Sequence, residues 1–358
     1  MSTHHKLLIL GASYGSLLAS KLLIAGHSVT LVCLPEEADL INREGTRVRM
    51  PVRGQDALVE IDSRTLPGEL SADVPTAVDP GDYDVVGLAM QEPQYRSPGV
   101  RELIDRIGKA RVPCMSIMNM PPPPFLARVP GVSSDACRHC FTEPEIWDGV
   151  EPALLTLCSP DPQAFRPPDE PTNVLQVRLP TNFKAARFES DEHTQILRDL
   201  ESSIDASRLR TDDGEHELPV RLRVHDSVLV PLAKWAMLVA GNYRCIRPTE
   251  IRPIRDTVYE DLDTSRAVYE WVLDVCRSLG ASDDDLVPFE KYANAAKMLE
   301  SPSSVARAVD GGAPHVERVD CLVQTIAAGQ GMRSDVVDEI VALVDAKLAE
   351  NRKEVAVP

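Results

Sequence analysis

The segment from Lys6 to Val32 constrains the fold more than any other part of the chain. It reads KLLILGASYGSLLASKLLIAGHSVTLV: an apolar run, a turn of small residues, a stretch with apolar residues at helical spacing, a glycine, and a second apolar run. Short strands that alternate with helices in this way pack as a parallel sheet with helices on both faces. The sequence therefore predicts an α/β fold at the N-terminus.

The alternation of strand and helix continues to about residue 118. The next expected elements are a helix, an apolar run, a second helix and a strand, at Pro35–Arg43, Asp84–Met90, Arg101–Lys109 and Val112–Met118. Between Asn119 and about Ser190 the pattern changes, and four consecutive prolines stand at 121–124. Proline cannot donate to a ladder, so loops and edge strands are expected there, the strands at Ala153–Leu157, Val174–Arg178 and Ala185–Phe188.

After about Asp205 the apolar residues repeat every three and four positions, which is typical of helices. The expected helices are Val228–Val239, Asp256–Leu279, Pro288–Leu299, Val316–Ala328 and Asp335–Leu348. The interpretation is a Rossmann-type dinucleotide-binding domain over 1–205, with a Pro-rich insertion after Asn119. An all-helical substrate and catalytic domain over 206–350 and a tail over 351–358 follow.

Charge and hydropathy exclude several classes of partner. The 358 residues carry 38 Lys and Arg against 55 Asp and Glu, a net charge of −17. Nucleic acids and anionic membranes need clustered basic residues, so neither is expected as a partner. No apolar stretch approaches the roughly 18 residues of a membrane span, and Lys6–Leu10 is too short for a signal-peptide core. A cytoplasmic protein is expected.

The eight cysteines are scattered, and in a cytoplasmic protein they stay reduced. Only Cys137-Arg138-His139-Cys140 has the spacing of metal ligands. A zinc site would need a second ligand pair, and the sequence offers none, so no metal is expected.

The turn between the first strand and the first helix favours dinucleotide binding. A helix N-terminus behind such a turn holds a pyrophosphate. The turn itself, which comprises Gly11, Ala12, Ser13, Tyr14, Gly15 and Ser16, has glycine at its first and fifth positions. The usual fingerprint has glycine at the first, third and sixth, so this turn is one residue shorter, with Gly15 in the helix-packing role. The alternative is a strand–helix turn that binds no nucleotide.

The end of the second strand favours NAD over NADP. The strand ends Cys33-Leu34-Pro35-Glu36-Glu37, with two carboxylates and no Arg or Lys to hold the extra phosphate of NADP. Two uncompensated carboxylates would repel a 2′-phosphate unless Arg43 or Lys6 folds in. The alternative is that both acids merely suit the start of a helix.

One lysine, Lys234, lies within the nearly uninterrupted apolar run PLAKWAMLVAGN at 231–242. A lysine in such a run is paired, functional, or extends its ammonium group to the surface.

The chain resembles the ketopantoate reductase (2-dehydropantoate 2-reductase) family. The resemblance covers most of its length and rests on GSLLASKLLIAGHSVTLV, Asn119 after a strand, LAKWAMLVAGN, SSVARAVDGGAPHVE and GQGMRSDVVDEIVALV, in this order. It implies a fold like that of 6-phosphogluconate dehydrogenase, with the nicotinamide and a 2-oxo acid in the cleft between two domains. It also implies NADP as the default cofactor, a role in pantothenate biosynthesis, and a 2-oxo acid as substrate. Whether the chain forms a homodimer stays open.

The resemblance also implies roles for individual residues. Lys234 corresponds to the catalytic lysine that bonds the reacting carbonyl and supplies its proton, and Asn119 to an asparagine that orients substrate and lysine. Ser304 corresponds to the serine that binds the substrate carboxylate, Glu317 to the glutamate that holds a substrate hydroxyl, and Asn242 to a second asparagine of the lysine helix. The alternatives are a strand-end turn residue for Asn119, a helix cap for Ser304 and a surface acid for Glu317.

The chain departs from the family pattern on both the cofactor side and the substrate side. The glycine turn is short, the expected basic residue is Leu34, and an expected lysine of the cofactor side is Gln91. On the substrate side Leu238 replaces an asparagine, Ala308 replaces an aspartate, and Glu317 aligns only with a one-residue insertion.

Three functions therefore remain open on the sequence. The first is an NAD(P)-dependent oxidoreductase that reduces a small 2-oxo acid to a 2-hydroxy acid. The second is a dinucleotide-binding paralogue or sensor without turnover, and the third is a reductase of an imine or a bulkier oxo-acid.

Overall fold

The computed structural model describes residues 3–211 and 214–355, and within them the chain forms two compact units. Unit 1 comprises residues 1–90, 94–118 and 145–228, and unit 2 comprises 91–93, 119–144 and 229–358. No helix of the described residues combines the length and the apolar character that crossing a membrane requires.

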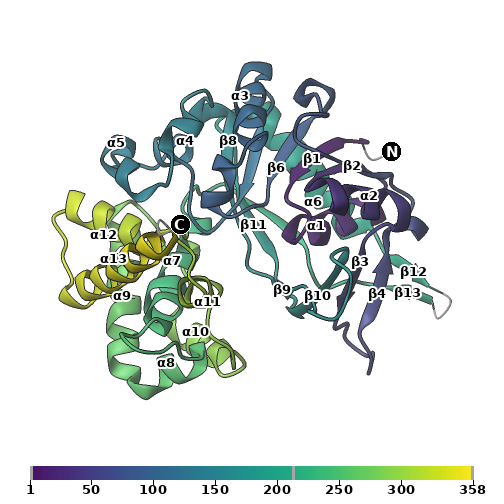
Figure 1. Cartoon of the computed structure of the whole chain (residues 1–358). Coiled ribbons are helices and arrows are strands. Elements are labelled where there is room, and N and C mark those ends of the chain that lie inside the picture. The colour runs from purple at the N-terminus through teal and green to yellow at the C-terminus, as the bar shows by residue number, and fades with distance from the viewer. Residues whose placement is uncertain (1–2, 212–213, 356–358) are drawn as a thin grey trace. The chain divides into compact units, whose positions relative to one another are not determined.

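Unit 1 is built on an eight-stranded sheet (Figure 1). Its order is β14-β11-β8-β7-β6-β1-β2-β5, and from β5 to β8 all neighbours are parallel. The strands are β1 Lys6–Leu10, β2 Ser28–Val32, β5 Leu70–Asp73, β6 Val85–Leu88, β7 Cys114–Ile117, β8 Leu155–Ser159, β11 Phe183–Ala186 and β14 Leu222–His225. Strand order reverses between β1 and β6, which is where doubly wound sheets bind ligands. The predicted Rossmann-type domain is confirmed.

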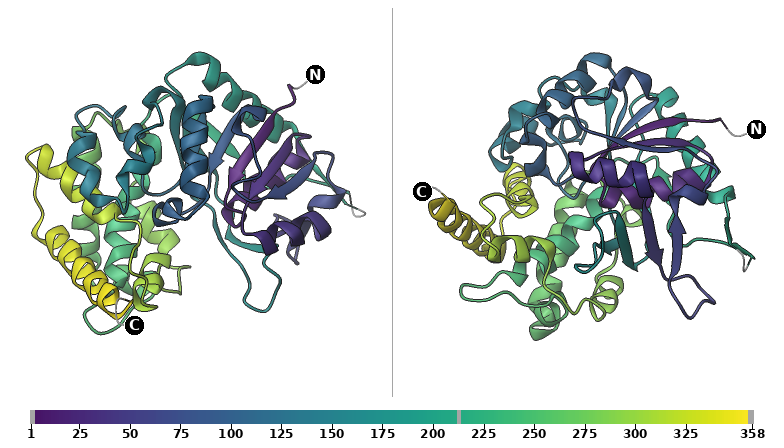
Figure 2. Two further views of the ribbon diagram at one scale, coloured as in Figure 1. Left: turned by 45° about the horizontal axis from the view of Figure 1, so that its top comes forward. Right: turned by 45° about the vertical axis from the view of Figure 1, so that its right-hand side comes forward.

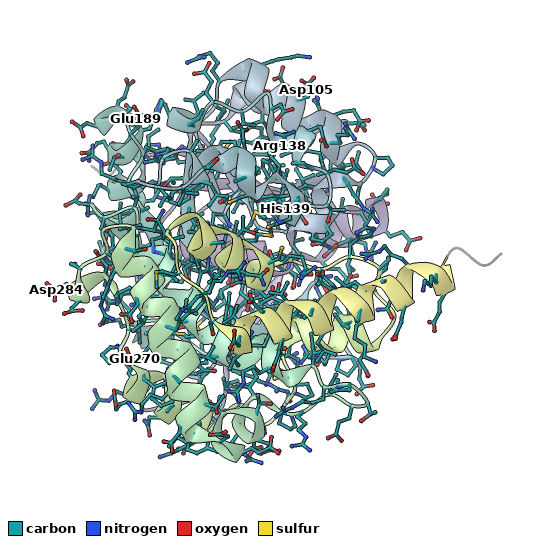
Figure 3. All side chains as sticks on the ribbon, turned by 90° about the vertical axis from the view of Figure 1, so that its left-hand side faces the viewer. Asp105, Arg138, His139, Glu189, Glu270 and Asp284 are labelled. Carbon is teal, nitrogen blue, oxygen red and sulfur yellow. The ribbon has the colours of Figure 1, made fainter. Side chains whose placement is uncertain are left out.

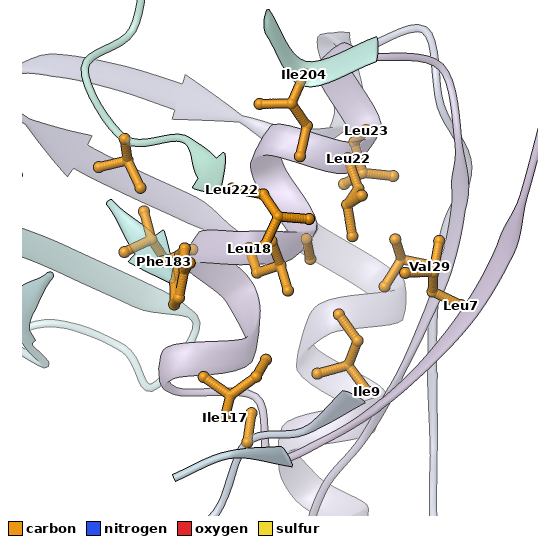
Figure 4. Packing of buried hydrophobic residues seen from close by; sticks show 14 of the residues in the cluster. Leu7, Ile9, Leu18, Leu22, Leu23, Val29, Ile117, Phe183, Ile204 and Leu222 are labelled. Atoms are coloured by element: carbon orange, nitrogen blue, oxygen red, sulfur yellow. The ribbon is translucent and has the colours of Figure 1, made fainter. Parts of the chain in front are cut away.

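The helices of unit 1 cover both faces of this sheet. They are α1 Tyr14–Ile24, α2 Pro35–Glu44, α3 Val100–Ala110 and α6 Asp191–Ala206. Because β1→β2 and β6→β7 run in opposite directions along the sheet, right-handed crossovers place α1 and α3 on opposite faces. On the α1 face, Leu18 and Leu22 of α1 pack with Ile9 of β1, Ile204 of α6 and Leu222 of β14 (Figure 4).

A smaller sheet and a hairpin complete unit 1. The four-stranded sheet has the order β4-β3-β10-β9, with β3 Arg47–Met50, β4 Val59–Asp62, β9 Gln163–Phe165 and β10 Val174–Leu179. The hairpin joins β12 Leu209–Thr211 and β13 Gly214–His216. The strands expected between 153 and 188 are present as β8, β10 and β11, but the expectation of edge strands is wrong, because each has a neighbour on both sides. Strand β8 lies between β7 and β11, β11 between β8 and β14, and β10 between β3 and β9.

Unit 2 is helical (Figure 1 and Figure 2). Its helices are α4 Pro123–Leu126, α5 Ser134–Cys137, α7 Lys234–Met237, α8 Ile254–Glu260, α9 Leu262–Ser278, α10 Phe289–Ala296, α11 Ser304–Asp310, α12 Val319–Gly329 and α13 Asp335–Val355. The yellow helices α12 and α13 lie side by side.

The division into units differs from the expected domain boundaries. Unit 1 continues to Val228 rather than ending at 205, because β14 pairs with β11 in the large sheet. The Pro-rich insertion, 119–144, belongs to unit 2, where α5 packs against α12. The expected tail begins as helix, since α13 extends to Val355, and residues 356–358 lie outside the described residues.

Two expected helices are interrupted. Val228–Val239 corresponds to a 3₁₀ turn, α7 and the π-helical turn η8 (Leu238–Asn242). Asp256–Leu279 is divided into α8 and α9 at Asp261, whose backbone is extended and whose side chain caps α9 by accepting from the Thr264 amide.

Candidate active site

The glycine turn of unit 1 has two of the three features of a dinucleotide-binding turn. Gly11 has a φ of +98°, and a Cβ there would lie 2.7 Å from the Ala89 carbonyl oxygen. A Cβ on Gly15 would lie 2.7 Å from Cγ2 of Ile9 in β1. Gly11 thus allows the tight turn, and Gly15 allows α1 to pack closely on the sheet.

The third feature, close approach at the helix start, is altered by Tyr14. Helix α1 begins at Tyr14 after Ala12 and Ser13, and its first turn carries no acidic residue. The Ser16 hydroxyl donates to the Ser13 carbonyl (2.9 Å), and the Tyr14 hydroxyl to the Pro162 carbonyl (2.8 Å). Burial raises the pKa of Tyr14. Because its first turn has no acidic residue, the helix start is compatible with a bound anion. The bond from Tyr14 to Pro162 joins it to the loop between β8 and β9.

The end of β2 carries a basic partner that the sequence analysis missed. Leu34 is 73% exposed and Glu36 is exposed, but Glu37 forms an ion pair with Arg166. Arg43, which the sequence analysis considered for this place, pairs with Glu44 instead (2.9 Å). Arg166 follows β9 and lies 129 positions from Glu37 in the sequence. Nothing local in the sequence signals this pairing.

A crevice in unit 2 gathers most of the residues that the family resemblance selects. It contains about 370 Å³ of empty space, its mouth included. Its lining residues are Gln91, Asn119, Leu238, Asn242, Tyr243, Ser304, Val305, Ala308, Val316, Glu317 and Val319. Four site residues expected on the substrate side therefore share one cavity, although they come from three distant segments of the chain.

The carboxylate of Glu317 is the main titratable group of the crevice. Burial raises its pKa to about 7, against the lowering effects of a hydrogen bond from Asn119 and of the positive charge of Lys234. The Asn119 amide nitrogen donates to Glu317 Oε2 (3.2 Å). The Asn119 Oδ1 atom is buried and has no hydrogen-bond partner among the described residues, so it can accept from a ligand.

The walls of the crevice are fixed by Tyr243 and Ser303. The Tyr243 hydroxyl donates to the Glu317 carbonyl (2.5 Å) and accepts from the Val319 amide (2.9 Å), and this fixes the segment before α12. The Ser303 hydroxyl donates to the Asn242 carbonyl (2.7 Å) and caps α11. Ser303 is thus the helix cap, while the exposed Ser304 beside it lines the crevice.

Lys234 begins α7 and is partly buried between the buried residues Ala233 and Trp235. It does not line the crevice, but its charge acts on Glu317. The structure thus places the expected catalytic lysine within electrostatic reach of the expected substrate residues.

The positions of two residues, Gln91 and Glu92, differ from what the sequence predicted. Gln91, expected on the cofactor side, lines the crevice of unit 2. Glu92, which the sequence analysis did not select, is buried and accepts from the amide and the hydroxyl of Thr142, at 2.9 Å each. Its charge also raises the pKa of Glu317. Glu92 begins a 3₁₀ turn four residues after the end of β6, and no local sequence pattern marks it as a site residue.

Comparison with known proteins supports the fold. No protein-family model matches the chain, and no curated protein matches it by sequence. Among solved structures, 2-dehydropantoate 2-reductase from Methylococcus capsulatus is similar with a TM-score of 0.66 and 12% identity, over 97% of each chain.

Two further structures are similar over nearly the whole length. A PanE/ApbA family ketopantoate reductase from Ralstonia eutropha JMP134 has a TM-score of 0.61 and 14% identity, over 97% of this chain and 99% of that chain. D-mandelate dehydrogenase, solved with NADH and anilino(oxo)acetate, has a TM-score of 0.63 and 12% identity, over the same shares. The chain therefore has the two-domain fold of these reductases, as the sequence resemblance predicted.

Proposed function

We propose that the protein is an NAD(P)-dependent oxidoreductase that reduces a small 2-oxo acid to the 2-hydroxy acid. The observation that carries the proposal is the crevice of unit 2, in which Asn119, Asn242, Ser304 and Glu317 converge. These are the residues that the family resemblance assigns to the substrate. The fold, shared with ketopantoate reductases and a mandelate dehydrogenase, supports the same class of reaction.

Each of the proposed site residues has its own role in the reduction. The Lys234 ammonium group donates a hydrogen bond to the substrate carbonyl oxygen and releases its proton to it as the alkoxide forms. Asn119 orients the carbonyl, and the Ser304 hydroxyl donates to the substrate carboxylate. Glu317, with a pKa of about 7, holds a polar group of the substrate, and Asn242 completes the polar side of the crevice.

The dinucleotide supplies the hydride when it is bound, and the turn from Gly11 to Ser16 would hold its pyrophosphate. The end of β2 favours NADH over NADPH. Arg166 neutralises one carboxylate, that of Glu37, while Glu36 and Asp73 remain as negative charges near this strand end. A 2′-phosphate there would still meet a net negative charge.

A second candidate within the same class is a 2-oxo acid with a larger apolar side chain. Leu238 and Ala308, which replace polar residues of the family, both line the crevice, and Val305 and Val316 extend the apolar wall. Such a wall would favour a substrate such as phenylglyoxylate over the hydroxylated ketopantoate.

The test is the kcat of the Lys234→Ala variant, measured with NADH and a panel of 2-oxo acids that includes ketopantoate and phenylglyoxylate. We expect kcat to fall by about two orders of magnitude or more, because proton transfer by a positioned side chain contributes about 10²–10⁴-fold. The control is Lys297→Ala, which removes an exposed lysine of unit 2 and should leave kcat unchanged.

Three outcomes test the role of Lys234 and separate the candidate functions. Activity that survives Lys234→Ala would remove Lys234 from the mechanism. Dinucleotide binding without turnover on any 2-oxo acid would favour the non-catalytic paralogue. A higher kcat/KM for phenylglyoxylate than for ketopantoate would favour the larger apolar substrate.

A further inference from the structure

A second cluster of reactive side chains lies in unit 2, apart from the residues that line the crevice. It joins the loop Cys137–Cys140 to the first turn of α12. The Cys140 and Cys321 sulfurs lie 3.3 Å apart, and the His139 Nε2 atom lies 3.7 Å from each of them. All three ligand atoms fall within 4.8 Å of one another. In Figure 3 His139 lies at the surface next to the yellow helix α12.

Cys321 supplies a third ligand that does not lie near Cys137 and Cys140 in the sequence. No metal was expected from the sequence, because no second pair of ligands accompanies Cys137 and Cys140. Cys321 lies 181 positions from Cys140, so only the fold brings the two thiols together.

The spacing of the three atoms matches one face of a metal tetrahedron. With Zn–S near 2.3 Å and Zn–N near 2.0 Å, tetrahedral angles separate two sulfurs by about 3.8 Å and a sulfur from a nitrogen by about 3.5 Å. The observed separations of 3.3 and 3.7 Å differ from these by a few tenths of an ångström. Small side-chain rotations would therefore suffice to bind the ion.

The histidine is already in the tautomer that a metal requires. Its Nδ1 atom lies 2.9 Å from the Ala136 carbonyl oxygen, which can only accept a hydrogen bond. The proton of the neutral ring is therefore on Nδ1, and the lone pair of Nε2 points toward the two sulfurs. Metal-bound histidines are commonly oriented in this way by a carbonyl group.

The cluster reaches the protein surface on its histidine side. The His139 side chain is exposed, whereas Cys140 and Cys321 are buried. Thr325 donates its hydroxyl to the Cys321 carbonyl (2.8 Å) and lies 3.3 Å from His139 Nε2.

We propose that His139, Cys140 and Cys321 bind a thiophilic divalent cation of the zinc class, with water as the fourth ligand. Two thiolates and an imidazole are the donors that zinc prefers over magnesium or calcium. The ion would fasten the loop 137–140 to Cys321 in the first turn of α12. Cys321 lies four residues after Glu317 in the sequence. Arg318 already stabilises this turn through a two-bond ion pair with the buried Asp320, at 3.0 Å for each bond.

The test is metal binding by the whole, reduced protein, without dinucleotide or substrate. Protein freed of metal by a chelator is titrated with Zn²⁺ against a chromophoric chelator. Co²⁺ is then added in place of Zn²⁺ to reveal thiolate charge-transfer bands in the near ultraviolet. We expect one equivalent to bind, and His139→Gln and Cys321→Ser to weaken binding by on the order of 100-fold or more.

His139→Gln is the decisive variant because it changes an exposed side chain and should leave the fold intact. Cys33→Ser, which removes a thiol of unit 1, is the matched control and should bind Zn²⁺ like the wild type. Equal affinity in His139→Gln and wild type, or no binding to the reduced protein, would overturn the proposal. A Cys140–Cys321 disulfide in protein alkylated directly after purification would also overturn it. None of these results depends on reductase activity.

Discussion

At the residue scale, Glu317 sets the electrostatics of the crevice. Its carboxylate is largely removed from water, and the hydrogen bond from Asn119 and the charge of Lys234 offset this burial only in part. A carboxyl group with a pKa of about 7 exchanges its proton near neutral pH.

The raised pKa of Glu317 predicts a pH-dependent stability. Because the folded state binds this proton more tightly than the unfolded state, its contribution is fully present below about pH 4.5 and is lost as pH rises through about 7. From pH 4.5 to 8 the Glu317→Gln variant should gain about 3 kcal/mol relative to wild type. Urea unfolding at several pH values measures this difference.

The control is Glu339→Gln, which changes an exposed acid on α13 of the same unit. It should follow the wild-type pH profile. If Glu317→Gln also followed that profile, the carboxylate would titrate normally in the folded protein, and its burial would not matter.

At the element scale, the π-helical turn η8 (Leu238–Asn242) determines which side chains reach the crevice. A π turn places an extra residue in the helical register, which redirects the side chains that follow, and such turns are frequent at functional sites. Here both ends of the turn, Leu238 and Asn242, line the crevice. Gly241 allows α10 to approach, since a Cβ there would overlap the Tyr292 hydroxyl.

This close approach predicts coupling between Gly241 and Tyr292. Gly241→Ala should destabilise the protein by about 1–3 kcal/mol, the usual cost of overpacking. Adding Tyr292→Phe removes the overlapping hydroxyl and should recover about 1 kcal/mol or more of that loss in a double-mutant cycle. The free energy of urea unfolding measures both effects.

Gly329→Ala is the matched control, because no atom lies within 4 Å of the added Cβ. Its free energy of unfolding should stay close to that of wild type. Additive effects of Gly241→Ala and Tyr292→Phe would mean that the contact between η8 and α10 does not limit the packing.

At the scale of the whole molecule, the proposed cofactor and substrate residues fall in different compact units. The glycine turn and Arg166 belong to unit 1, whereas the crevice and Lys234 belong to unit 2. The tryptophans report on the units separately, since Trp147 lies in unit 1 and Trp235 and Trp271 lie in unit 2.

This separation predicts where dinucleotide binding stabilises the molecule. With Trp235→Phe and Trp271→Phe combined, the remaining Trp147 reports on unit 1. NADH at about 100 times its Kd should raise the stability so reported by about 2.7 kcal/mol. NADPH at the same concentration should raise it less, because of the carboxylates at the end of β2.

The Trp147→Phe protein, which reports on unit 2, is the comparison. A shift seen only in this protein would place the dinucleotide site outside unit 1. A larger shift with NADPH than with NADH would mean that Arg166 outweighs the neighbouring acids.

The periodicity of the sequence predicted part of unit 1, but not strands β3, β4 and β5, helix α6 or strands β12 to β14. Strands β1, β2, β6 and β7 and the helices between them lie within a few residues of their expected bounds, because each has a regular apolar face. The interruptions at Leu238 and Asp261 were not predictable in this way. A π turn and an extended N-cap both leave the apolar spacing of the surrounding sequence nearly unchanged.

Some residues of the candidate site were also predicted from the sequence, and others were found only in the structure. Asn119, Asn242, Ser304 and Glu317 were selected by the resemblance to the ketopantoate reductase family, and they share one crevice. Glu92 and Tyr243 carry no such pattern, and their roles follow from contacts with residues about 50 and 74 positions away.

The sequence by itself determined the first strand–helix–strand unit, the glycine turn within it and the helical character of most of unit 2, since local apolar spacing suffices for these. Only the tertiary structure decided which distant groups meet. Arg166 pairs with Glu37 across 129 positions, and Cys321 joins His139 across 182. Burial at such meeting points also sets the pKa of Glu317, and burial is a property of the fold rather than of any short segment.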